Sequence, residues 1–479
     1  MKRLALILLF SVFGLGLFAQ AGSLPVRPEQ LPEQKPVKYT PPHLIQRTLP
    51  NGIRVIMLPD HTLPLVDIEA VVKVGSIYEP AGKLGLAGLT GRCLETGGTK
   101  NYPADKLAEA LDGMAARVSS NIGKEMGTLD MNILSKDVDK GVPIFADMLM
   151  HPVFDARKVE IERAKMMESI RREFDRPITI AVKEFYQALY GGDSPWARRT
   201  TVKDVMSIKR EDMAAFHARY FHPNATILAV AGDFDPKAME KMLTKAFRTW
   251  KKEKVDYPTV AGAPAEENPG VTLVNKPELT QTTVLVGELT APRGRGRTFN
   301  RDVYAMDVMN FILGGGGFNS ILMREIRSNR GLAYGAGSFY SFATVRGIFG
   351  AYTQTGVKTT AQASALMKQA FERMASKPPT ADELKIAKDN LINKFVFNYQ
   401  TASQIADRAA HLEFYGYPAD YMATYTDHIS KVTPADCRKV AEKYLHPDKM
   451  SWLVLGPADA LKQGMGKLGE VSIKPLPKP

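Results

Sequence analysis

The chain has 479 residues, which is too long for one ordinary hydrophobic core, so two or more domains are expected. Hydrophobic residues make up 44% and charged residues 24%, as in soluble globular proteins. The net charge of +12 would suit nucleic acid or an acidic membrane surface. However, basic residues are mixed with acidic ones and no nucleic-acid-binding signature is present, which argues against a nucleic-acid partner. The densest basic cluster, Arg293–Arg297, is expected to be a surface loop.

The N-terminus has the pattern of a secretory signal peptide. Two basic residues precede the apolar run Leu4–Phe18, and small residues at 19–21 offer a cleavage site. The run is too short to span a membrane, and no other stretch reaches that length. We therefore expect residues 1–21 to be removed, residues 22–44 to form an extended leader, and the mature protein to be exported, in a bacterium to the periplasm.

Residues 45–250 are predicted to form an α+β domain. Pro50-Asn51-Gly52 lies between two apolar runs and indicates a hairpin. Val66, Ile68, Ala70, Val72 and Val74 alternate with Asp67, Glu69 and Lys73, which predicts a strand. Further elements are expected in chain order: a helix from Tyr102 to about Ala116, a strand pair to Leu134, helices around 138–150 and 155–174, a helix from Arg210 and a strand over 225–231.

A second domain repeats this order. Residues 251–270 shift to charged residues, Pro, Gly and Ala, and are predicted to be a linker between the first domain and residues 271–465, which residues 466–479 follow as a tail. Tyr-Phe-His-Pro at 220–223 and Tyr-Leu-His-Pro at 444–447 both precede an apolar strand, and similar helix starts occur at Asp155 and Thr380. We therefore expect two tandem homologous α+β domains that face each other across a cleft.

The stretch Gly314–Tyr334 combines several features of a binding site. Four glycines break a helical pattern, a short basic helix follows, and Gly331 ends it before a strand. One face of that helix carries Arg324, Arg327 and Arg330. A solvated arginine face and a site that grips a peptide or an anion are both compatible with this pattern.

These features together resemble the pitrilysin/insulinase and mitochondrial-processing-peptidase family. The resemblance rests on GLAGLTGRCLETGGT at Gly85–Thr99, on LMREIRSNRGLAY at Leu322–Tyr334 and on the two His-Pro strand starts, and it extends from about residue 45 to 465. It implies a duplicated domain, each half an antiparallel sheet with helices packed on one side.

The family's zinc motif is degenerate in this sequence. In the family, two histidines at i and i+4 hold zinc, a glutamate at i+3 positions water, and a third ligand is a glutamate on a later helix. The matching positions are Gly88, Gly91, Arg92 and Ser169, with Glu168 one place from the last. We therefore expect this chain to bind no zinc and no other cofactor.

The remaining candidate ligands offer no replacement. His217 and His222 are five residues apart and so lie on different helical faces, which favours a structural role. Cys93 and Cys437 could form one bridge or stay as two buried thiols, and neither arrangement makes a disulfide scaffold.

The second half keeps the other part of the family's site. There, an arginine and a tyrosine seven residues apart bind the substrate backbone and stabilise the oxyanion, and Arg327 and Tyr334 match them. A glycine-rich loop that lies along substrate in processing-peptidase partners corresponds to Gly314, Gly315, Gly316 and Gly317. The alternatives are a surface ion pair for Arg327, a strand position for Tyr334 and a simple helix-ending turn for the glycines.

The resemblance implies a non-catalytic subunit of a two-subunit peptidase, inactive alone, whose homologous partner carries the zinc. The main alternative is a degenerate peptide-binding or scaffold protein of the cell envelope, and a third hypothesis is a self-sufficient zinc protease. The positive net charge favours acidic or extended peptides as substrate. The sequence leaves open the peptide, the partner and its stoichiometry.

Overall fold

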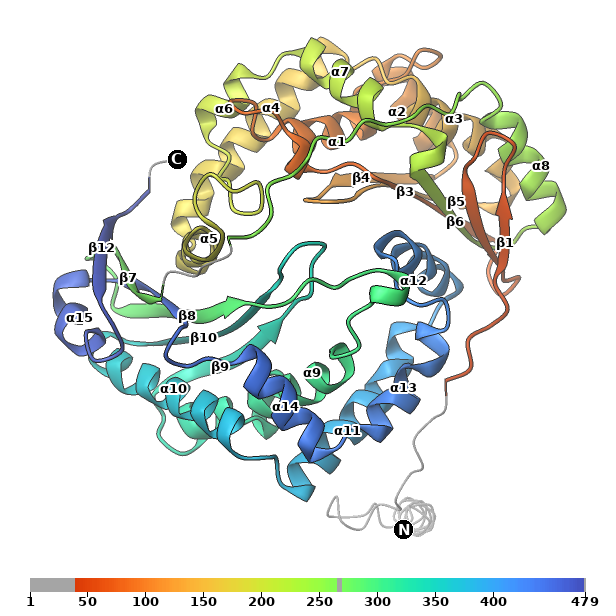
Figure 1. Cartoon of the computed structure of the whole chain (residues 1–479). Coiled ribbons are helices and arrows are strands. Elements are labelled where there is room, and N and C mark those ends of the chain that lie inside the picture. The colour runs from red at the N-terminus through yellow and green to blue at the C-terminus, as the bar shows by residue number, and fades with distance from the viewer. Residues whose placement is uncertain (1–38, 265–268, 478–479) are drawn as a thin grey trace, which may run out of the picture. The chain divides into compact units, whose positions relative to one another are not determined.

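Two six-stranded sheets, one in each half of the chain, form the framework of the computed structural model (Figure 1). The structure describes residues 39–264 and 269–477, so the expected signal peptide and most of the leader lie outside the described residues. The first sheet contains β1 (Ile45–Thr48), β2 (Arg54–Pro59), β3 (Leu65–Val72), β4 (Arg117–Ile122), β5 (Gly127–Leu134) and β6 (Thr226–Gly232). The second contains β7 (Gly270–Asn275), β8 (Gln281–Leu289), β9 (Ala333–Tyr340), β10 (Ile348–Gly356), β11 (Ser451–Gly456) and β12 (Val471–Pro475).

The strand orders confirm the internal duplication. The first sheet runs β1-β2-β6-β3-β5-β4 and the second runs β12-β7-β11-β8-β10-β9, so five strands correspond one to one. Most neighbours are antiparallel, but β2 pairs with β6, and β7 with β11 and β12, in parallel. The expected tail, residues 466–479, therefore contributes an edge strand to the second sheet.

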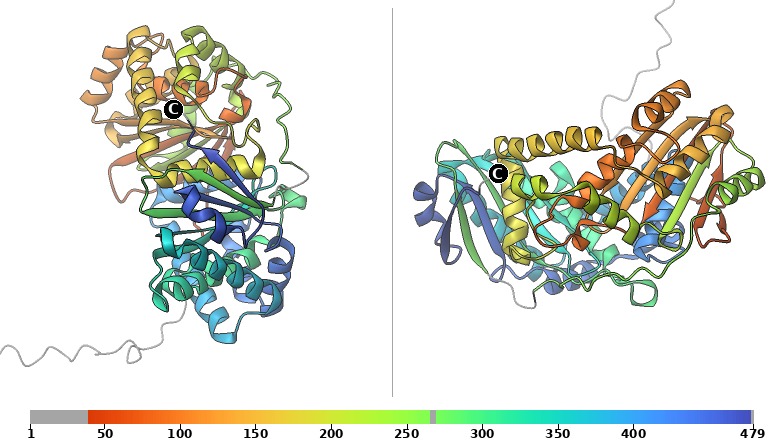
Figure 2. Two further views of the ribbon diagram at one scale, coloured as in Figure 1. Left: turned by 90° about the vertical axis from the view of Figure 1, so that its left-hand side faces the viewer. Right: turned by 90° about the horizontal axis from the view of Figure 1, so that it is seen from above.

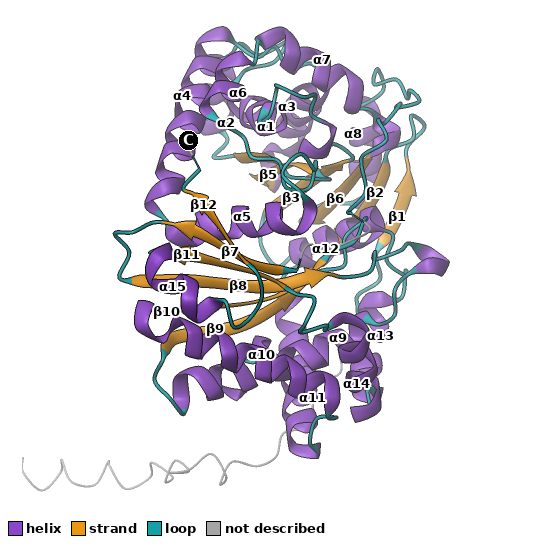
Figure 3. Ribbon diagram, turned by 60° about the vertical axis from the view of Figure 1, so that its left-hand side comes forward, coloured by secondary structure: helices purple, strands orange, loops and turns teal. Residues whose placement is uncertain are grey.

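Helices cover the sheets in both halves (Figures 2 and 3). The first half contains α1 (Leu86–Thr96), α2 (Ala104–Gly113), α3 (Val138–Met150), α4 (Ala156–Arg172), α5 (Pro177–Tyr190), α6 (Val202–Ser207), α7 (Arg210–Tyr220) and α8 (Pro236–Ala246). The second half contains α9 (Val303–Asn310), α10 (Thr360–Ser376), α11 (Ala381–Phe395), α12 (Ala402–Tyr415), α13 (Tyr421–Lys431), α14 (Pro434–Tyr444) and α15 (Ala458–Met465).

The repeated helix starts are N-caps. The Asp155 carboxylate accepts a hydrogen bond from the Lys158 amide at 3.0 Å, which begins α4. Thr380 begins α11 in the same way, since its hydroxyl accepts from the Glu383 amide at 3.2 Å and the Glu383 side chain accepts from the Thr380 amide. A cap of this kind satisfies an amide that the helix leaves unpaired, which explains why both repeats keep a polar residue there.

Each half also lends one helix to the sheet of the other half, which the sequence did not reveal. Helix α5 packs on β8 and β11 of the second sheet, and α12 packs on β2, β3 and β6 of the first. Phe185 of α5 lies in a buried cluster with Leu285 and Leu453 of the second sheet. A sheet face rich in apolar side chains has to be covered, and the exchanged helices cover the faces that each half's own helices leave open.

Two expectations about individual residues are resolved. Cys93 and Cys437 are both free thiols, buried in the cores of different halves. The expectation of a surface loop at Arg293–Arg297 is wrong for Arg293, which is only 7% exposed, donates to the Phe342 carbonyl at 3.1 Å and stacks on the Tyr415 ring. No helix within 39–264 or 269–477 is long and apolar enough to span a bilayer.

Candidate functional site

Helix α1 carries the three degenerate motif positions, and packing fills the space around them. A Cβ atom added to Gly91 would lie 3.1 Å from Cγ1 of Ile122 and 3.2 Å from its backbone nitrogen, so any side chain there would have to displace β4. At Gly88 the nearest atom to an added Cβ is the terminal methyl of Met166, at 3.6 Å. The strand β4 thus crowds Gly91, whereas Gly88 has only an ordinary van der Waals contact with an apolar methyl group.

The third motif position on α1, Arg92, lies near an acid that is neither the expected third-ligand position, Ser169, nor its neighbour Glu168. Its guanidinium lies 4.0 Å from the buried carboxylate of Glu162 on α4. Ser169 is exposed, and Glu168 forms an ion pair with Arg172 at 2.7 Å. A guanidinium repels a cation and a glycine offers no ligand atom, so these residues do not fit zinc.

No other group in the described part of the chain offers a metal site. Within it, no three or more His, Cys, Asp or Glu side chains are placed to hold an ion together. His217 is buried and its Nε2–H donates to the Leu149 carbonyl at 2.9 Å. Burial lowers the pKa of His217 to about 4, so the imidazole is neutral and has a structural role at the end of α7.

Arg327 and Tyr334 lie together on the surface of the second half. The guanidinium carbon of Arg327 is 4.6 Å from the centre of the Tyr334 ring and 4.7 Å from the centre of the Phe318 ring. Tyr334 at the start of β9 is 86% exposed and Phe318 is 65% exposed. We call these three residues the Arg-aromatic stack. Two aromatic faces hold the cation in place and leave its N–H donors and the phenol facing solvent.

Irregular helical turns bring the members of the stack together. Residues Phe311–Gly315 and Met323–Ser328 are π-helical, and the short turn Gly317–Asn319 between them carries Phe318. Gly331, with φ 63°, ends the second π-helical segment by donating its amide to the Arg327 carbonyl at 2.8 Å. The π-helical turns widen the local spacing of side chains, and such turns are frequent at functional sites.

The neighbouring arginines have other partners. Arg330 forms an ion pair with Glu325 at 2.6 Å, and Arg324 lies 3.6 Å from Glu383 and 3.8 Å from Glu325. Among residues within the described ranges, Arg327 makes no ion pair. The three arginines of this segment therefore differ, and only Arg327 has its charge free for a ligand.

The glycine run has a steric explanation within the fold. A Cβ on Gly314 would lie 2.3 Å from the Ser338 amide nitrogen, one on Gly315 would lie 2.7 Å from the Asn310 side chain, and one on Gly316 would lie 2.7 Å from the Phe311 carbonyl oxygen. Gly317 has φ 58° and open space around its Cα. Packing thus disfavours a side chain at the first three glycines, while the backbone of Gly315 and of Gly317 is exposed.

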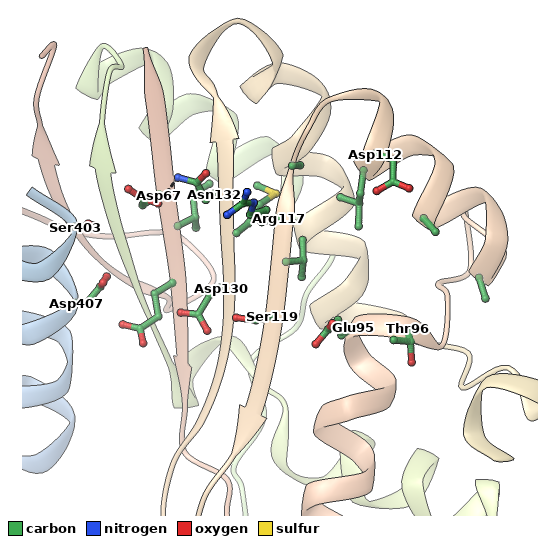
Figure 4. A pocket seen from close by; sticks show the side chains of 18 of the residues that line it. Asp67, Glu95, Thr96, Asp112, Arg117, Ser119, Asp130, Asn132, Ser403 and Asp407 are labelled. Carbon is green, nitrogen blue, oxygen red and sulfur yellow. Dashed lines mark hydrogen bonds between the residues drawn. The ribbon is translucent and has the colours of Figure 1, made fainter. Parts of the chain in front are cut away.

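A pocket of about 740 Å³ opens beside the end of α1 (Figure 4). It is bounded by β3, β4, β5 and α2 of the first half and by α12 of the second, so both halves line it, as a cleft between tandem domains requires. Its charged lining is mainly acidic and comprises Asp67, Glu69, Glu95, Asp112, Asp130 and Asp407, against Arg117 and Lys158. The lining of this pocket is therefore negative although the whole chain is positive, and it does not support the expected preference for acidic peptides.

Glu69, Asp130, Asp407 and His411 form a cluster of interacting titratable side chains where this acidic pocket meets α12. His411 of α12 contacts the buried Glu69 carboxylate at 2.8 Å, and the second oxygen of Glu69 has no partner among the described residues. Burial, aided by the charge of Glu69, raises the pKa of Asp130 to about 6 and that of Asp407 to about 7. Burial lowers the pKa of His411, but its bond to Glu69 outweighs this and the pKa is raised overall.

The contribution of this cluster to stability is expected to fall as the pH rises from about 4 to about 8. Over this window the folded protein keeps protons on Asp130, Asp407 and His411 that the unfolded chain releases earlier, so raising the pH disfavours folding. Asp407→Asn should raise stability at about pH 8 by about 1–2 kcal/mol and flatten this dependence. Urea unfolding midpoints measured across the window test this.

The control for this measurement is Asp427→Asn, at an exposed aspartate on α13 away from the cluster. It should leave the slope against pH unchanged. A slope in Asp407→Asn equal to that of the unmodified protein would show that Asp407 does not titrate with the cluster.

Two family models match the chain, over successive segments. "Insulinase (Peptidase family M16)" matches residues 54–193, and "Peptidase M16 inactive domain" matches residues 207–391. The chain belongs to the M16 peptidase family. This M16 member lacks the zinc motif, because Gly88, Gly91 and Arg92 stand at the motif positions.

Relatives and solved structures of M16 type cover most of the chain. An uncharacterized zinc protease of Mycobacterium leprae is 28% identical over 86% of this chain and 91% of its own length. Another, of Rickettsia bellii, is 27% identical over 68% of this chain and 77% of its own. The crystal structure of a peptidase M16 inactive domain from Pseudomonas fluorescens aligns with TM-score 0.78 and 23% identity over 91% of this chain and all of that one. The crystal structure of a protease from Helicobacter pylori aligns with TM-score 0.77 and 21% identity over 87% of this chain and 100% of that chain.

Sequence reasoning singled out Arg327 and Tyr334 as candidates but missed two features of this region. It did not identify Phe318, although an aromatic residue directly after a glycine run on an exposed turn was a usable signal. It also missed the acidic pocket, because Asp67 and Glu69 alternate with apolar residues as on a solvated strand. That face of β3 is instead covered by α12 from the other half.

Proposed function

We propose that this M16 chain is the zinc-less subunit of an exported heteromeric peptidase. In this arrangement it supplies substrate binding and oxyanion stabilisation to a homologous subunit that holds the zinc. The observation that carries the proposal is the Arg-aromatic stack: a half-buried guanidinium that makes no ion pair among the described residues contacts an exposed phenol, at the two positions that match the family's pair.

The chemistry of the stack agrees with that role. As a carbonyl is attacked, negative charge develops on its oxygen, and fixed N–H and O–H donors stabilise that charge most when they are already in place. Arg327 is held between two rings and needs little rearrangement, and its charge is permanent. A surface arginine with only a structural role would more commonly be paired, as Arg324 and Arg330 are.

The sheet edges support peptide binding. β4 and β9 are edge strands, β4 beside the degenerate motif and β9 carrying Tyr334. An extended peptide can add to such an edge through backbone hydrogen bonds, while side-chain pockets set specificity. The acidic pocket beside β4 favours a substrate side chain with positive charge.

The rival function is a peptide-binding or scaffold protein with no part in proteolysis. Reconstitution separates the two. The purified chain should contain less than about 0.1 zinc per chain by metal analysis and cleave no peptide alone, since its motif residues cannot hold a metal. Mixed with a homologous subunit that carries the His-x-x-Glu-His motif and was recovered with it by pull-down, it should yield peptidase activity that the partner lacks alone.

Three results would decide against the proposal. Stoichiometric zinc on this chain would indicate a self-sufficient enzyme. A partner fully active without this chain, or a mixture no more active than the partner, would favour the scaffold role. Export is tested separately by N-terminal sequencing of the mature protein, which should begin near Gly22.

A further inference from the structure

A second cavity, of about 370 Å³, lies within the second half and shares no lining residue with the Arg-aromatic stack or the acidic pocket. Its walls come from α9, β9, the end of α11, α12 and α13. Five tyrosines and two phenylalanines line it, together with one carboxylate, Asp307, and one guanidinium, Arg408. This tyrosine cavity has no role in the function proposed above.

Asp307 is the only acid in the lining and keeps access to the cavity. Its two oxygens accept hydrogen bonds from the hydroxyls of Tyr340 at 2.6 Å and Tyr425 at 2.8 Å. It forms no ion pair within residues 39–264 and 269–477, and part of its surface remains accessible. Burial raises its pKa to about 6, which leaves the carboxylate mostly ionised at neutral pH. The cavity therefore contains a negative charge without a bonded counter-ion.

Several of the aromatic rings that line the cavity with that charge contact one another. Phe395 stacks on Tyr425 with 4.5 Å between ring centres, and Tyr425 lies 5.7 Å from Tyr421. Phe395 also contacts Tyr399 at 4.9 Å. The faces of such rings carry negative electrostatic potential and attract cations, most of all cations that have little hydration to lose.

Arg408 of α12 supplies the opposite charge. Its side chain is exposed and makes no ion pair with any described residue, and its charge opposes the rise that burial causes in the pKa of Tyr399. Its charge also lowers the pKa of Tyr417, against the larger effect of burial. The cavity thus has an acid among the rings and a free guanidinium at its solvent side.

We propose that the tyrosine cavity binds a small zwitterion of the betaine type. The quaternary ammonium lies among the rings against Asp307, and the carboxylate pairs with Arg408. A primary ammonium fits less well, because its N–H donors would have to share the Asp307 oxygens with the Tyr340 and Tyr425 hydroxyls, whereas a quaternary ammonium needs no acceptor. A simple cation leaves Arg408 unpaired, and a simple anion is repelled by Asp307.

Isothermal titration of the full mature chain with three probes tests the assignment. Glycine betaine should bind with Kd below about 1 mM. Choline, which has the ammonium but no carboxylate, should bind about tenfold more weakly. The probe 3,3-dimethylbutyrate keeps the carboxylate and replaces the ammonium by an uncharged group of the same shape, and it should bind at least about tenfold more weakly than glycine betaine.

Two variants separate the contributions. Asp307→Asn keeps the size of the side chain and should weaken glycine betaine and choline alike by at least about tenfold. Arg408→Gln lies on the exposed side, should not affect folding, and should weaken glycine betaine but not choline. No heat with any probe at about 10 mM, equal binding of 3,3-dimethylbutyrate and glycine betaine, or unchanged glycine betaine affinity in Arg408→Gln would each overturn the proposal. None of these readouts depends on peptidase activity.

Discussion

Replacing Tyr334 by phenylalanine should lower the turnover of the reconstituted peptidase by about 10²–10³-fold, the usual cost of removing one oxyanion donor. The substitution deletes only the phenol hydroxyl. Tyr334 is 86% exposed, so folding should be unaffected, and the ring that stacks on Arg327 remains. Steady-state kinetics of the mixed complex should show the loss mainly in kcat rather than in KM, because the donor acts on charge that develops during the reaction.

The matched control is Tyr352→Phe. Tyr352 is also exposed, at 42%, and lies on β10 of the same sheet, so the same hydroxyl deletion should leave turnover unchanged. Arg327→Lys extends the test, because lysine keeps the charge but loses the planar group that stacks between the rings. Full activity of the Tyr334→Phe complex would show that the Tyr334 hydroxyl takes no part in the reaction. The proposed catalytic contribution of this chain would then lose its main support.

Replacing Phe185 by alanine should cost about 3–5 kcal/mol of stability, the largest effect that we expect from a single core substitution. Phe185 of α5 is fully buried between the halves, against Leu285 and Leu453 of the other sheet. Truncation leaves a cavity that β8 and β11 cannot close, since both are fixed by sheet hydrogen bonds. Urea unfolding followed by circular dichroism measures the change.

Ile178→Ala on the same helix is the control. Ile178 is 38% exposed, so its truncation should cost less than about 1 kcal/mol. Equal losses of stability from both substitutions would mean that the packing of α5 on the sheet of the other half contributes no more than the local stability of the helix.

The sequence predicted the framework because its signals are local. Alternation over Val66–Val74, the N-caps Asp155 and Thr380 and the repeated His-Pro strand starts each report on a few neighbouring residues, and the structure contains the corresponding elements. The spacing of Arg327 and Tyr334 was likewise readable, and the structure places the two side chains in contact.

The remaining features depend on contacts between distant segments. No local pattern shows that α12 lies on the first sheet, so Glu69 looked like a solvated strand residue although it is buried against His411. Arg293 was assigned to the surface for the same reason, because its partners, Phe342 and Tyr415, are far along the chain. The basic helix of the sequence pattern is a π-helical turn, a distinction that residue spacing alone does not make.

The exchange of α5 and α12 bears on how such a chain could have arisen. A protein made of one half alone would expose one face of its sheet, and the helix able to cover it would belong to a second copy. Two copies of a single-half ancestor would therefore have formed a two-fold symmetric dimer, in which each subunit packed one helix on the sheet of the other. Joining the two gene copies end to end would keep this helix exchange within one chain, and the two halves could then diverge in sequence. Only then could one half lose its metal ligands while the other kept its arginine and tyrosine.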